Sequence, residues 1–205
     1  MRKLTVQTRH GEARVALGDS TGARGALILG HGAGGGVNAP DLQATARAAE
    51  RANWAIGLVE QPYRVAGRRA PAPAPRLDES WLDVIAALAG DPLTGLPLVT
   101  GGRSSGARVA CRTAAAAGVV GVVCLAFPLL PPGRAGSAKP PQSRLDELDA
   151  VTVPTLVVQG RQDRFGLPPS GANRIVIAVA GDHSLRSAPA AVGEAVESWL
   201  CALPA

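Results

Sequence analysis

Short apolar segments alternate along the chain with longer segments in which apolar residues recur every three or four positions. The short segments are typical of buried β-strands, and the longer ones of helices with one apolar face. The pattern predicts strands at residues 4–8, 13–17, 26–29, 54–59, 98–101, 119–126, 155–159 and 174–179. It predicts helices at residues 41–51, 78–89, 107–117 and 190–200.

This alternation indicates an α/β fold of three layers, in which helices cover both faces of a doubly wound, mostly parallel sheet. The first two strands lie too close in sequence for a crossover helix, so we expect an antiparallel hairpin at one edge. Residues 60–76, rich in Pro and Arg, and residues 128–143, rich in Pro, Gly and Ser, are expected to be loops. We find no internal repeat and no polar linker, and predict one domain over residues 1–205.

Composition narrows the class of protein. Apolar residues make up 46% of the 205 residues, which fits a globular core and argues against disorder. No apolar run approaches the ~20 residues that span a bilayer, and the N-terminal residues do not resemble a signal peptide. We therefore expect a cytoplasmic protein with no membrane partner. The three cysteines lack metal-type spacing, which favours buried free thiols and predicts no metal site.

The net charge of +5 raises the question of a nucleic-acid partner. Arginine far outnumbers lysine, which is typical of a GC-rich bacterial genome. The basic residues are scattered and not interleaved with aromatic residues, so we predict no nucleic-acid binding. The exception is one basic segment within residues 60–76, which contains Arg64, Arg68, Arg69 and Arg76.

Residues 102–106 read Gly-Arg-Ser-Ser-Gly, a G-x-S-x-G pentapeptide between a predicted strand and a predicted helix. In that setting the middle serine stands on a sharp turn with its hydroxyl exposed, where it can act as a nucleophile. Gly102 and Gly106 supply the small residues that so tight a turn needs. Ser104 is the predicted nucleophile. Ser105 is a rival by proximity, but it lacks the glycine two residues before it.

A serine nucleophile needs a base, and the base needs an acid that orients it. His183 lies between the last predicted strand and the last predicted helix, where its loop can face the serine. His10 is expected at the surface, and His31 belongs to the glycine-rich loop considered next. Asp163 follows the strand at residues 155–159 and precedes the histidine, so it is the predicted acid. Asp182, adjacent to His183, is badly placed to reach the same ring.

Charge that develops on an acyl oxygen requires hydrogen-bond donors already in place. The backbone N–H of Ser105 is one candidate donor. The second is expected from Ala33 or Gly34, in the loop His31-Gly32-Ala33-Gly34-Gly35-Gly36. This loop matches neither a phosphate-binding P-loop nor a dinucleotide fingerprint, because the residues that those motifs require are missing.

Other polar residues near these segments have structural roles as alternatives to substrate binding. Arg103 is expected to pair with a neighbouring acid and fix the turn, although contact with a substrate carboxylate is the competing interpretation. Arg108 and Arg112 are spaced to form a solvated stripe on the helix that follows Ser104. Glu60, Gln61 and Tyr63 follow the strand at residues 54–59 and are expected at the rim of the site.

The glycine-rich loop, the Gly-Arg-Ser-Ser-Gly turn, Asp163 and His183 occur in the order found in the α/β-hydrolase superfamily, which the chain resembles over essentially its whole length. The short motifs are more narrowly similar to a small branch without a cap. That branch includes dienelactone-hydrolase-like proteins and the testis-expressed and KANSL-type hydrolase-like domains of animals. Only residues 128–153 are available for a cap, which implies an open site.

The resemblance implies a serine hydrolase that acts on a small acyl substrate without a cofactor. Ser104, His183 and Asp163 would form the catalytic triad, and Ser105 with Ala33 or Gly34 the oxyanion hole. Esters, thioesters, lactones and small peptides all remain open as substrates, as does the oligomeric state. The alternative is a non-catalytic interaction protein with the same fold, since some of the animal relatives are viewed as scaffold components. The basic segment within residues 60–76 would then be the docking segment.

Overall fold

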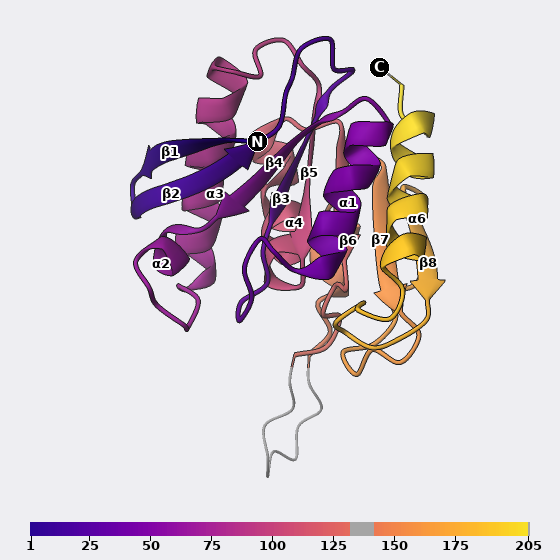
Figure 1. Cartoon of the computed structure of the whole chain (residues 1–205). Coiled ribbons are helices and arrows are strands. Elements are labelled where there is room, and N and C mark those ends of the chain that lie inside the picture. Colours follow the sequence, from indigo (N-terminus) through magenta and orange to yellow (C-terminus); the bar gives the residue numbers. More distant parts are fainter. Residues whose placement is uncertain (132–141, 205) are drawn as a thin grey trace.

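An eight-stranded sheet runs through the computed structural model, which describes residues 1–131 and 142–204. The strands lie in the order β1-β2-β4-β3-β5-β6-β7-β8 (Figure 1). All neighbours from β4 to β8 pair in parallel, whereas β1 pairs antiparallel with β2 and β2 antiparallel with β4. The strands are β1 (Arg2–Thr8), β2 (Gly11–Leu17), β3 (Ala26–Gly30), β4 (Ala55–Glu60), β5 (Leu98–Arg103), β6 (Gly121–Leu125), β7 (Thr155–Gly160) and β8 (Arg174–Val179).

Helices cover both faces of this sheet, as the alternating pattern predicts. α1 (Pro40–Arg51) and α6 (Pro189–Ala202) lie side by side on one face, with α3 (Ala74–Gly90) and α4 (Ser105–Ala117) on the other (Figure 1). Each pair of helices packs into its own apolar cluster against the sheet. Leu29 is buried in one cluster and Ile28 in the other, because successive residues of a strand point to opposite faces.

Two segments expected to be loops contain or border helices. α2 (Pro62–Val65) lies within residues 60–76, and α3 begins at Ala74 rather than at residue 78. Two of the prolines that suggest a loop, Pro62 and Pro75, stand at the first or second helical position, where a missing N–H costs nothing. The other expected loop, residues 128–143, falls partly outside the described residues, and α5 (Leu145–Asp149) follows it.

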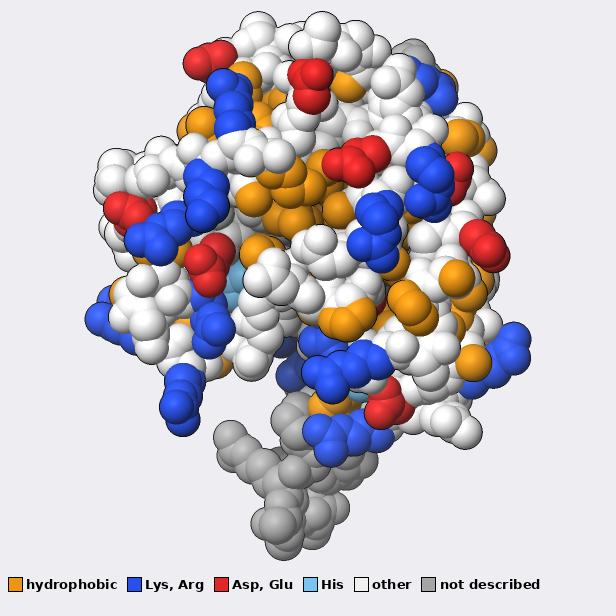
Figure 2. Space-filling view, in the orientation of Figure 1, with side chains coloured by type: hydrophobic (Ala, Val, Ile, Leu, Met, Phe, Trp, Pro, Cys, Tyr) orange, Lys and Arg blue, Asp and Glu red, His pale blue; other side chains and the backbone are white. Residues whose placement is uncertain are grey.

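No cap domain appears among the described residues between β6 and β7, where α5 contributes the one helix. In the described part of the chain, no helix is both long and apolar enough to cross a membrane. Cys111 and Cys124 are buried free thiols, as expected. The expectation is wrong for Cys201, which is exposed because α6 turns that position away from buried Leu200. Figure 2 shows Lys and Arg side chains interspersed with acidic ones over one face of the molecule.

The turn between β5 and α4 requires glycine because α4 crosses β3 at backbone distance. A Cβ atom on Gly106 would lie 2.5 Å from the carbonyl oxygen of Gly30. We expect Gly106→Ala to lower the free energy of unfolding by roughly 1–3 kcal/mol, because the two backbones must separate. Gly90→Ala is the control, since a Cβ there meets nothing within 4 Å. Urea denaturation of both variants measures the difference, and equal stability would contradict a close approach at Gly106.

Candidate active site

Ser104 stands alone between the last residue of β5 and the first residue of α4. Its backbone has φ 53° and ψ −108°, a conformation that a residue with a side chain rarely adopts. The backbone N–H of Ser104 donates a hydrogen bond of 2.9 Å to the carbonyl oxygen of Leu125, at the end of β6. The strained turn is therefore held by the neighbouring strand, and Ser104 itself is only partly buried.

His183, in the loop after β8, connects Ser104 to Asp163 in the loop after β7. Its Nε2 lies 3.0 Å from the Ser104 Oγ, and its Nδ1 lies 2.8 Å from the Asp163 Oδ2. A carboxylate only accepts hydrogen bonds, so the pairing places the ring proton on Nδ1 and leaves Nε2 as an acceptor for the serine hydroxyl. The structure thus brings together the three side chains that the sequence predicts for this chemistry.

The Asp163 side chain is fully buried and held by donors besides the histidine. The Gln159 Nε2 donates to Asp163 Oδ2 at 2.8 Å, and the backbone N–H of Phe165 donates to Oδ1 at 2.9 Å. The same Gln159 nitrogen faces the carbonyl oxygens of Phe127 at 3.0 Å and Gly166 at 2.9 Å. These oxygen acceptors fix the orientation of the Gln159 amide, and Gln159 in turn fixes the Asp163 carboxylate.

Sequence reasoning missed Gln159 and Phe165. Gln159 is fully buried and directly follows the apolar centre of β7, and a polar residue at such a position was a usable signal. The ring of Phe165 meets the His183 ring edge-on, with centroids 4.5 Å apart. No sequence signal distinguishes this phenylalanine from an ordinary apolar loop residue. Phe165 thus packs against the imidazole, while Gln159 orients the carboxylate.

The loops that carry Asp163 and His183 cross at Gly160. A Cβ on Gly160 would lie 2.4 Å from the Asp182 carbonyl oxygen, so only glycine permits this crossing. The backbone N–H of Gln162 donates to the Gly181 carbonyl oxygen at 2.9 Å and ties the two loops together. The Asp182 side chain is occupied elsewhere, because its Oδ1 accepts from the backbone N–H of Ser184 at 2.8 Å.

The glycine-rich loop after β3 lies against the turn that carries Ser104. A Cβ on Gly32 would lie 3.7 Å from the Cβ of Ser104. Within the described part of the chain, the backbone N–H groups of Ala33, Gly34 and Ser105 donate no hydrogen bond. Ser105 is the first residue of α4, where backbone N–H groups have no partner within the helix. These free donors are the groups that the sequence predicts for the oxyanion hole.

Hydrogen bonds of His31, Gln61 and Tyr63 hold the glycine-rich loop in place. His31 Nδ1 donates to the Gly32 carbonyl oxygen at 2.8 Å, and His31 Nε2 accepts from the backbone N–H of Gln61 at 3.2 Å. Burial lowers the pKa of His31, which favours this neutral ring. The Tyr63 hydroxyl donates to the Ala33 carbonyl oxygen at 3.1 Å. Gln61 and Tyr63 are therefore buried supports of the loop, and the expectation that they rim the site is wrong.

Arg103 pairs with a neighbouring acid, as expected for the residue before the serine. Its Nε lies 2.8 Å from the Oδ2 of Asp41, a fully buried carboxylate on α1. Its Nη2 donates to the carbonyl oxygen of His183 at 3.0 Å. Burial raises the pKa of Asp41, and the positive charge of Arg103 opposes that rise. One side chain thus links α1, the turn and the histidine loop.

The expected solvated stripe on α4 is wrong. Arg108 bonds to Glu147 on α5 at 2.9 Å, and Arg112 bonds to Asp78 on α3 at 2.8 Å. All four side chains are at most one-quarter exposed. Spacing along α4 reveals which residues share a face, but not which helices bring carboxylates to that face.

Comparison with known proteins places the chain in a family. The model of the α/β hydrolase domain family matches residues 23–197, and the chain belongs to that family. A search of curated proteins finds no match to the sequence.

Solved structures with the same fold include a serine hydrolase described as lacking a lid. A serine hydrolase homologue from Coxiella burnetii is 17% identical, with a TM-score of 0.74 and 97% of each chain covered. A serine hydrolase without a lid from Xanthomonas campestris is 17% identical, with a TM-score of 0.71, covering 99% of this chain and 96% of the other. The dienelactone hydrolase from Anabaena variabilis is 18% identical, with a TM-score of 0.75, covering 97% of this chain and 95% of the other. At these identities the likeness establishes the shared hydrolase fold.

The ion pair between Arg103 and Asp41 yields a stability prediction. We expect Arg103→Met to lower the free energy of unfolding by about 3 kcal/mol, because a fully buried carboxylate loses its counter-charge. The double variant Asp41→Asn/Arg103→Met is expected to recover part of that loss, since no buried charge is left unpaired. Urea denaturation of the four proteins in this cycle gives the coupling. Strict additivity of the two changes would contradict the pairing.

Proposed function

We propose that this protein is a serine hydrolase that cleaves small esters or related acyl compounds through an acyl-enzyme intermediate. The observation that carries the proposal is the continuous path from Asp163 Oδ2 through the His183 ring to Ser104 Oγ, with distances of 2.8 and 3.0 Å. Membership of the hydrolase family supports it at the level of reaction class. The proposed domain spans residues 1–205.

Each step of the reaction is assigned to a group of this chain. Ser104 Oγ attacks the acyl carbon while His183 Nε2 takes the hydroxyl proton. The carboxylate of Asp163 keeps the proton on Nδ1 and stabilises the imidazolium that forms. The backbone N–H of Ser105, with that of Ala33 or Gly34, binds the oxyanion. His183 then protonates the leaving group, and a water molecule activated by the same nitrogen releases the acyl group from Ser104.

The proposed substrates are small and approach from solvent. Among the described residues, no cap follows β6, and the Ser104 side chain is only half-buried. A structure of Est1E from Butyrivibrio proteoclasticus with bound ferulic acid has the same fold, with 15% identity, a TM-score of 0.77 and 98% of each chain covered. Small acyl compounds suit such an open site, and a long acyl chain would find no covering wall within residues 1–131 and 142–204.

Covalent labelling tests the proposed nucleophile. We expect a fluorophosphonate probe to modify Ser104, and Ser104→Ala to lose labelling and lower kcat on a small activated ester by a factor of about 10⁴ or more. Ser105→Ala is the matched control, because its proposed role uses the backbone N–H. Mass mapping of the modified peptide identifies the residue. A folded wild-type protein that is neither labelled nor active would overturn the proposal in favour of the non-catalytic interaction protein.

The role of Asp163 as the acid is tested by comparison with Asp182, the carboxylate next to His183 in the sequence. We expect Asp163→Asn to lower kcat by a factor of about 10⁴, because an amide no longer selects the ring tautomer. Asp182→Asn is expected to change kcat less than about tenfold, because the Asp182 side chain bonds to Ser184 rather than to the imidazole. The measurement is kcat of both variants at a saturating ester concentration, and circular dichroism checks that both are folded. Equal losses in the two variants would remove Asp163 from its role.

A further inference from the structure

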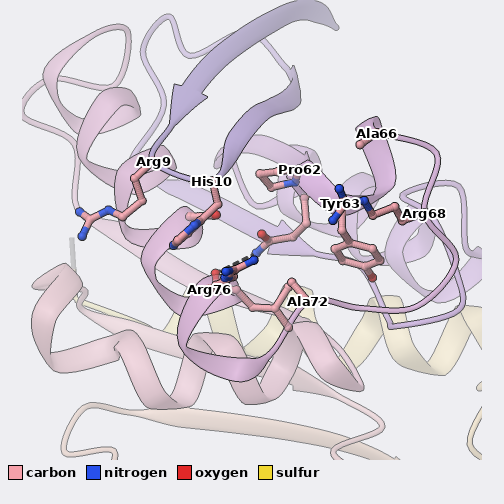
Figure 3. Close-up of a pocket in the computed structure, with 11 residues that line it drawn as sticks. Arg9, His10, Pro62, Tyr63, Ala66, Arg68, Ala72 and Arg76 are labelled. Carbon is pink, nitrogen blue, oxygen red and sulfur yellow. Dashed lines mark hydrogen bonds between the residues drawn. The ribbon is translucent and has the colours of Figure 1, made fainter.

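A cavity of about 390 Å³ lies between the β1–β2 turn, α2 and the start of α3 (Figure 3). Its lining includes Arg9, His10, Arg68 and Arg76 together with a short apolar wall. None of Ser104, His183 and Asp163 contributes to it. The cavity is therefore separate from the candidate active site and takes up part of the basic segment within residues 60–76, to which the proposed hydrolysis assigns no role.

The charge of this lining is unbalanced. It contains three arginines and a histidine but no acidic residue. Arg9 pairs with Asp83 at 2.8 Å, and His10 pairs with Glu79. Arg68 and Arg76 form no ion pair within residues 1–131 and 142–204. In Figure 3 the Arg9 side chain is directed away from the other labelled residues. Two guanidinium groups thus remain available to an anion.

The rest of the lining includes a short apolar wall. Pro62, Tyr63, Ala66, Ala72 and Leu77 supply the apolar surface. Gln61 is 5% exposed, and its Nε2 donates to the Leu77 carbonyl oxygen at 3.3 Å. A bare inorganic ion would leave the apolar wall uncovered, whereas an organic anion covers it.

We propose that this cavity binds a small organic anion, with its carboxylate or phosphate bound by the guanidinium group of Arg68 or Arg76 and its apolar body against Pro62 and Tyr63. Guanidinium groups suit this task because they stay charged and present paired donors to a planar or tetrahedral anion. The volume lies within the usual range of small-molecule pockets.

The back wall of the cavity touches the glycine-rich loop of the candidate active site. Gln61 bonds through its backbone to His31 at 3.2 Å, and the Tyr63 hydroxyl bonds to the Ala33 carbonyl oxygen at 3.1 Å. A ligand against Tyr63 is thus one side chain away from a proposed oxyanion donor. The binding site itself stands without the hydrolase proposal, because no residue of the triad forms it.

Calorimetric titration of the full chain with phenyl phosphate and with benzoate tests the site. We expect saturable binding of at least one probe, and the tighter one identifies the preferred head group. Arg68→Gln/Arg76→Gln is expected to raise that Kd at least about tenfold, since each charge-assisted bond is lost. Arg47→Gln/Arg69→Gln is the control: it removes the same charge from two exposed arginines outside the cavity, and its Kd should change less than about twofold.

Three results would overturn the proposal. The first is no saturable binding of either probe by the wild-type chain. The second is an equal Kd in the two double variants, which would show only a general attraction to a basic protein. The third is inorganic phosphate binding as tightly as phenyl phosphate, which would exclude a role for the apolar wall. Binding in the absence of any fluorophosphonate labelling would leave this site standing while the hydrolase proposal fails.

Discussion

The left-handed backbone of Ser104 constrains everything around it. With φ at 53°, the chain turns from β5 into α4 within one residue. Ser104 therefore lies directly before the first backbone N–H groups of the helix. Such a conformation persists only when its surroundings hold it. Here Leu125 on β6 accepts the serine N–H, and glycines at positions 102 and 106 let α4 approach β3 at backbone distance.

The parallel strands explain how distant residues come to this turn. β3, β5, β7 and β8 run in one direction, so the loops that follow them open at one end of the sheet. The glycine-rich loop, Ser104, Asp163 and His183 each follow one of these strands. The candidate site thus lies at the carboxyl ends of parallel strands, where open α/β sheets commonly bind ligands. Local contacts then convert proximity into hydrogen-bonding distance.

Those local contacts come from residues that take no part in the proposed chemistry. Gln159 orients the Asp163 carboxylate, Arg103 holds the backbone of His183, and His31 fastens the glycine-rich loop to the segment after β4. Each is buried or partly buried, where a polar group without a partner is costly. Their bonds restrict the loops that carry Asp163 and His183 and the glycine-rich loop, and the Arg103–Asp41 pair extends this support to α1.

The sequence by itself determined the eight strands and the four long helices in their order along the chain, the antiparallel hairpin and the turn at residues 102–106, because these depend on local periodicity and on glycine placement. It also indicated Ser104, Asp163 and His183 as partners, because a parallel sheet leaves few loops at one end. The tertiary structure alone decided the partners of Arg103, Arg108 and Arg112, the buried roles of Gln61 and Tyr63, and the exposure of Cys201. These depend on which helices and loops pack together, and contacts between distant segments leave no periodic trace in the sequence.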